Sequence, residues 1–161
     1  MNPPKAEASH IAAVDTWIVQ VVEGASPVEQ LELFRAAVEA LWSRAVSTLG
    51  SVTLVAIAER VLSTAVHHHG FLSAISARPN GDSRWKAQAR DRLATVHGPE
   101  LIAGLRFALI ELLTVIGRLT AEILSPELHA ALRDVRAPSL DAEAPAGLHV
   151  VPTSLAGKAQ S

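Results

Sequence analysis

The chain contains no cysteine and no tyrosine among its 161 residues, and only three tryptophans and three phenylalanines. The missing cysteine excludes disulfides, thiolate zinc sites, cysteine-ligated iron–sulfur clusters and cysteine nucleophiles. With so few aromatic side chains, we expect a core built from Leu, Val, Ile and Ala. The formal net charge is only −2, so no overall charge attracts the protein to nucleic acid.

The sequence also lacks the motifs of the common enzyme classes. There is no glycine-rich phosphate-binding loop, and no serine lies in a nucleophile-elbow context. We therefore expect a protein that is not an enzyme and that binds no cofactor. A recognition-helix pattern for duplex DNA is missing too, so no nucleic-acid partner is expected.

Long uncharged apolar runs are absent as well. The longest apolar stretch, residues 101–124, is interrupted by Arg106, Glu111, Arg118 and Glu122, and charges inside a membrane span are costly. The N-terminal residues do not resemble a signal peptide. We expect a cytoplasmic protein without a membrane span, and the excess of Arg over Lys with abundant Ala suggests a GC-rich bacterial source.

Hydrophobic residues are plentiful instead, at 49% against 19% charged residues, and the mean hydropathy is +0.26. Such an excess has to be buried in a packed bundle, an oligomer interface or a hydrophobic ligand pocket. Apolar residues recur at helical spacing. They predict an all-α fold, a single bundle of about five helices plus a short C-terminal helix over residues 8–135. A flexible N-terminus (1–7) and a flexible tail (136–161) are expected to flank it.

Two serine–proline pairs mark predicted helix starts. Ser26 can cap a helix, Pro27 suits the first helical position, and Glu29 can reach back to complete a capping box. The pair recurs at Ser125-Pro126, where it predicts a short helix that continues to Val135.

The remaining boundaries follow from apolar spacing and from glycine and proline. A first helix is expected over residues 9–24, a third over 51–70, a fourth over 83–96 and a fifth over 100–124. Residues 71–82 could form a short strand or a last helical turn.

The predicted fifth helix is apolar on two sides. Its second seam consists of Ile102, Leu109 and Leu113. A helix of this kind is normally central in a bundle or forms part of a dimer interface, so we predict that these three residues mediate self-association. Gly104 and Gly117 would allow another helix to come close.

Three charged residues interrupt this apolar helix, namely Glu111, Arg118 and Glu122. If they were buried they would need partners and could form a site. Arg118 and Glu122 are four residues apart, a spacing at which helical side chains can pair. A solvated outer stripe is therefore the expected arrangement.

The candidates for a metal or haem site are three consecutive histidines, His67, His68 and His69. Neighbouring helical residues point about 100° apart, so three in a row cannot face one ion from a regular helix. We expect them to be structural or solvent-facing. Phosphotransfer is a further alternative, because histidine phosphotransfer domains are four-helix bundles of about this size, but the lysine usual in that family is missing after the tract.

A basic segment is the last candidate. It combines Trp85 with five cations, Arg78, Arg84, Lys86, Arg90 and Arg92, offset by Asp82 and Asp91. A solvated helix is the plain interpretation. Contact with an acidic partner or a membrane surface is the sharper one, and for it Trp85, Arg84, Lys86, Arg90 and Arg92 are the predicted interaction residues.

Taken together, the sequence favours a small non-enzymatic regulatory or adaptor protein. We expect it to act through protein–protein contacts, as a homodimer and in bacterial signalling. A sensor bundle that binds a small hydrophobic ligand, haem or metal is the alternative from another class, and a histidine phosphotransfer protein is the second.

Overall fold

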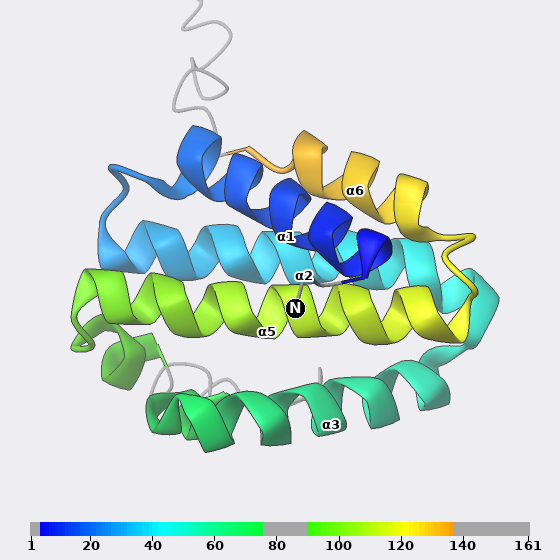
Figure 1. The fold of residues 1–161 in the computed structure, drawn as a ribbon. Helices are drawn as coiled ribbons and strands as arrows, with labels where there is room; N and C mark the ends of the chain where they lie inside the picture. Colours follow the sequence, from blue (N-terminus) through cyan, green and yellow to red (C-terminus); the bar gives the residue numbers. More distant parts are fainter. Residues whose placement is uncertain (1–3, 76–89, 137–161) are drawn as a thin grey trace, which may run out of the picture.

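The computed structural model describes residues 4–75 and 90–136, and every regular element in these two ranges is a helix (Figure 1). The elements are α1 (Lys5–Trp17), a π-helical turn (Ile18–Val22), α2 (Pro27–Leu49), α3 (Ser51–His68), a 3-10 turn (Gly70–Ala74), α5 (Gly98–Leu119) and α6 (Ser125–Asp134). The predicted all-α fold is confirmed. Of the described helices, none is long and apolar enough to cross a membrane.

α5 is the central helix, because it contacts α1, α2, α3 and α6. In Figure 1 it runs through the middle of the bundle, with α3 on one side and α1 and α6 on the other. Leu101, Leu109 and Leu113 are almost completely buried on it. This is the position expected for a helix that is apolar on two sides.

The core is aliphatic apart from one aromatic pair. Trp17 and Phe34 pack edge to face, with their ring centroids 5.2 Å apart. The Trp17 indole Nε1 also donates a hydrogen bond of 3.1 Å to the carbonyl oxygen of Val135. Trp17 therefore ties the C-terminal end of α6 to α1 and to the core.

The start of α2 follows the capping prediction. The Ser26 hydroxyl accepts the backbone N–H of Glu29 at 3.3 Å, and the Glu29 carboxylate accepts the backbone N–H of Ser26 at 2.7 Å. Pro27 occupies the first helical position. The predicted capping box is therefore confirmed, and it satisfies two donors that the helix itself leaves free.

The first helix begins earlier than predicted. It starts at Lys5, where Pro4 caps it from an extended conformation, rather than near residue 9. It continues through the π-helical turn, and Gly24 takes a left-handed φ of 87° just beyond that turn. The predicted end at Gly24 thus marks the true end of this helical stretch, because a left-handed φ is easiest for glycine.

The fifth helix ends earlier than predicted, at Leu119 instead of about residue 124. Ala121 and Glu122 have left-handed φ values of 48° and 63°, a conformation that costs an L-residue roughly 1–2 kcal/mol. The backbone N–H of Glu122 donates to the Gly117 carbonyl at 2.7 Å and closes the helix end. The prediction was wrong here because apolar residues continue at helical spacing beyond the point where the backbone becomes left-handed.

The segment left open in the sequence begins with the 3-10 turn, so its first part is helical rather than a strand. Gly104 on α5 makes room for this turn, since a Cβ atom there would lie 2.4 Å from the Phe71 ring and 3.3 Å from the His69 ring. Gly104 allows the close approach that was predicted, although aromatic side chains use it and not a helix backbone.

Candidate functional site

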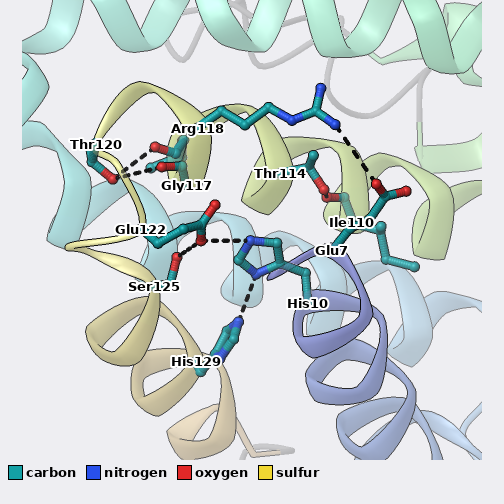
Figure 2. A network of polar contacts seen from close by, with 11 residues as sticks. Glu7, His10, Ile110, Thr114, Gly117, Arg118, Thr120, Glu122, Ser125 and His129 are labelled. Atoms are coloured by element: carbon teal, nitrogen blue, oxygen red, sulfur yellow. Dashed lines mark hydrogen bonds and ion pairs between the residues drawn. The ribbon is translucent and has the colours of Figure 1, made fainter. Parts of the chain in front are cut away.

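Two histidines from opposite ends of the sequence meet in the bundle (Figure 2). His10 on α1 and His129 on α6 are 119 positions apart, and their ring nitrogens Nδ1 and Nε2 lie 2.8 Å from each other. The rings stand nearly perpendicular, at 79°. His10 is only 1% exposed, whereas His129 is partly exposed. This histidine pair joins the first and last helices of the bundle.

Glu122 approaches the other nitrogen of His10. Its Oε2 atom lies 3.2 Å from His10 Nε2 and also accepts the Ser125 hydroxyl at 2.5 Å. The His10 contact is within ion-pair distance but outside hydrogen-bond geometry. Glu122 therefore faces His10 at close range without an aligned hydrogen bond. We call His10, Glu122, Ser125 and His129 the polar cluster.

Gly117 explains how Glu122 reaches this position. A Cβ atom on Gly117 would lie 2.6 Å from Glu122 Oε2 and 2.7 Å from Oε1. The carboxylate therefore rests directly on the backbone of α5, where only glycine leaves space for it. Gly117 was predicted to admit another helix, whereas in the structure the Glu122 side chain occupies this space.

Proton positions in the histidine pair follow from the partners on each side. The carboxylate near His10 Nε2 favours a proton on that nitrogen, which leaves His10 Nδ1 as an acceptor. His129 Nε2 then carries the hydrogen of the contact between the rings. Burial, then the charge of His10 and then that of Arg133, lowers the pKa of His129, while Glu122 acts in the opposite direction.

The polar cluster was missed in the sequence, although a signal for it exists. His10 lies four residues before Val14 and seven before Trp17, a spacing that places all three on the buried face of α1. Ser125 and Leu128 similarly lie on the buried face of α6. A polar residue in a buried helical register needs a partner, and this requirement could have drawn attention to His10.

The predicted Arg118–Glu122 pair is not formed. Glu122 follows the end of α5 and turns towards His10, while Arg118 Nη2 lies 3.7 Å from the carboxylate of Glu7 on α1. The expected Arg118–Glu122 pairing was therefore wrong, although Arg118 is exposed as expected and Glu111 and Glu122 are half-buried. The helix ends before Glu122, so the spacing of four residues no longer places the two side chains on one face.

A second interhelical ion pair joins α1 to α5. Arg106 donates two hydrogen bonds to the Asp15 carboxylate, at 2.5 and 2.9 Å. These bonds lower the pKa of Asp15 and raise that of Arg106. Both side chains are more than a third exposed, so solvent weakens the stabilisation that the pair provides.

The histidine tract lies elsewhere, at the end of α3. His67 and His68 are exposed, and the His68 and His69 rings lie 4.9 and 5.8 Å from the ring of Phe107. Within residues 4–75 and 90–136, no group of three or more His, Asp or Glu side chains is placed to hold a metal ion. The tract therefore packs beside an aromatic ring on α5.

The predicted interaction residues are divided between buried and exposed positions. Leu109 and Leu113 are buried within the single chain, and Ile102 is half-buried. Neighbouring helices thus cover most of the second seam, which corrects its use as a free surface. Arg90 and Arg92 are exposed, and Arg90 lies 4.0 Å from Glu32. The other residues of the basic segment, Arg78, Arg84, Trp85 and Lys86, lie outside the described residues.

Family models, curated proteins and solved structures were each compared with this chain, and none of the three comparisons found a match.

Proposed function

We propose that this protein is a non-enzymatic helical module that acts by binding another protein, as regulatory and adaptor proteins do. A second copy of the same chain is the first candidate partner. The observation that carries the proposal is a set of exposed apolar side chains at one end of the bundle. We call it the end surface, and it consists of Val52, Leu119 and Ile123.

The residues of the end surface lie at or next to two connections between helices. Val52 lies in the first turn of α3, Leu119 is the last residue of α5, and Ile123 belongs to the turn before α6. The exposed fractions of these side chains are 83%, 59% and 77%. In Figure 1 the α2–α3 and α5–α6 connections lie at the same end of the bundle.

Single exposed apolar side chains are ordinary, but several on one end of a small domain favour a binding surface. Three of the five large hydrophobic side chains that are exposed among the described residues belong to the end surface. Ile123 directly follows Glu122 in the turn after α5, so the polar cluster and the end surface share this turn.

Light scattering on the full chain tests the proposal. The L119K/I123K variant adds two charges to the end surface. V19K is the matched control, because Val19 is 61% exposed and lies outside the end surface, in the π-helical turn that follows α1. We expect a dimer mass for the wild type and for V19K, and a monomer mass for L119K/I123K.

A monomer mass for the wild type at high protein concentration would rule out self-association. In that case the partner would be a different protein, and its capture from extracts of the native host should require the end surface. Binding retained by V19K and lost by L119K/I123K supports the proposal, and equal binding by both variants contradicts it. The hydrophobic-ligand, haem, metal and phosphotransfer alternatives remain predictions.

A further inference from the structure

The contact within the histidine pair has room for one hydrogen only. The two nitrogens are 2.8 Å apart, which is a hydrogen-bond distance and requires one donor and one acceptor. In the neutral pair this condition is met, since one ring carries the N–H and the other the lone pair. The number of protons that the two rings hold therefore determines whether α1 and α6 stay connected at this point.

One added proton leaves the contact intact. One ring then donates through its inner nitrogen, while the other ring accepts with its inner nitrogen and carries its hydrogen on the outer one. A second added proton changes this, because both inner nitrogens then carry hydrogens that face each other at 2.8 Å. Two like charges at this distance in a buried site repel each other strongly.

The charged groups around His129 do little to accommodate that second proton. His10 faces it from α1, Glu122 from the turn before α6, and Arg133 lies on its own helix. Arg133 adds further positive charge. The buried residues of α2 and α5, the other two helices packed on α6, are uncharged. Among the described residues whose charges act on His129, Glu122 is the one anion, and one carboxylate balances one proton. Glu7, one turn before His10 on α1, faces Arg118 instead.

α6 is built so that loss of this contact has a defined consequence. Leu128 and Leu132 on its inner side are fully buried. The turn before it contains Ala121 and Glu122, which have left-handed φ values. Repulsion in the pair would separate α6 from α1 on the side of His129. The Trp17–Val135 hydrogen bond would still hold the far end of the helix.

We propose that the histidine pair is an acid-sensitive contact, which closes α6 onto α1 when it holds at most one added proton and releases α6 when it takes up a second. Release separates α6 from α1 near His129 and exposes the neighbouring Leu128, while Trp17 still holds the C-terminal end of the helix. This inference does not depend on the proposed end surface, because it rests on other residues, namely His10, Glu122 and His129.

Hydrogen exchange of the full chain, followed by mass spectrometry and corrected for the intrinsic pH dependence of exchange, tests the proposal. Between pH 7.5 and pH 5.0 we expect the opening of residues 125–134 to increase by at least about tenfold, since each linked proton contributes up to about tenfold per pH unit. Exchange of α2 should change much less over the same range.

Variants make the test specific. H129Q keeps a hydrogen-bonding side chain that does not titrate, so its α6 exchange should lose the pH response. H67Q changes an exposed histidine of the tract and should retain it. E122Q removes the anion that balances the first proton, so the response should move to higher pH. This last variant keeps the proposal testable if H129Q fails to fold.

Equal α6 exchange of the wild type at both pH values would overturn the proposal. The same holds for a pH response that survives in H129Q or disappears in H67Q. An E122Q response that moves to lower pH would contradict the assignment of Glu122 as the balancing anion.

Discussion

Two groups of histidines in this molecule differ in their spacing along the sequence and in their burial in the structure. His67, His68 and His69 are consecutive, yet two of them are exposed and their rings pack beside Phe107. His10 and His129 are isolated in the sequence, yet they touch in a largely buried position. The group that attracts attention in the sequence is therefore the less constrained one in the structure.

Helix geometry accounts for this difference. Consecutive residues on a helix point in different directions, so a tract spreads its side chains around the axis. Two single residues on different helices converge when each occupies the buried register of its own helix. His10 does so beside Val14 and Trp17. For an all-α protein, a polar residue in a buried register is thus a better guide to a site than a run of similar residues.

Replacement of one histidine from each group should give the largest difference in the free energy of unfolding. We expect H10A to lower the free energy of unfolding by about 3 kcal/mol, because it leaves a cavity and removes the partner of His129 and Glu122. H67A should change it by less than about 0.5 kcal/mol, as exposed positions usually do. Urea unfolding measures both, and equal losses in the two variants would contradict the distinction.

The support of Glu122 by Gly117 gives the next largest effect. We expect G117A to cost about 2 kcal/mol, because the new Cβ atom would displace the carboxylate from His10. G98A is the matched control on the same helix, since a Cβ atom there meets nothing within 4 Å. Urea unfolding that finds G117A as stable as G98A would show that Glu122 is not held in this way.

The pH dependence of stability should distinguish the two groups as well. Burial, followed by the charges of His10 and Arg133, lowers the pKa of His129 below its ordinary value of 6.5. The unfolded chain then binds the proton first, so stability is complete above about pH 6.5 and decreases as the pH falls below it. Urea titrations should find this decrease in the H67Q/H68Q/H69Q variant and a smaller one in H129Q. The reverse result would assign the titration to the tract.

The exposed Asp15–Arg106 pair should have the smallest effect. D15N removes an ion pair that also links α1 to α5, but both side chains are more than a third exposed, so we expect less than about 1 kcal/mol. The hydrogen bonds from Arg106 lower the Asp15 pKa. This contribution is therefore present above the pKa of the unfolded aspartate and is lost as the pH falls through the lower pKa of the folded state. If D15N lowered the free energy of unfolding as much as H10A does, the larger contribution assigned to the histidine pair would be contradicted.

The two serine–proline motifs indicate how far the sequence could predict the fold. The Ser26 capping box is local, so residues 26–29 contain all the information it needs, and it forms as predicted. Ser125 also begins a helix, but its hydroxyl donates to Glu122 and does not cap. The helix start was predictable in both cases, and the role of the second serine was not.

The polar cluster escaped prediction for a related reason. Its geometry depends on the left-handed φ of Glu122, on the open space above Gly117 and on the approach of His10 from a helix more than a hundred residues away. Apolar periodicity contains none of these three facts. It located most of the helices and the central position of α5, which depend on burial alone.

Nitrogen NMR of the protein labelled with ¹⁵N-histidine tests the central claim most directly. The account predicts a scalar coupling across the hydrogen bond between His10 Nδ1 and His129 Nε2 at neutral pH, absent in H129Q and unchanged in H67Q. A His10 ring that shows no such coupling and has the nitrogen shifts of a solvent-exposed imidazole would contradict it.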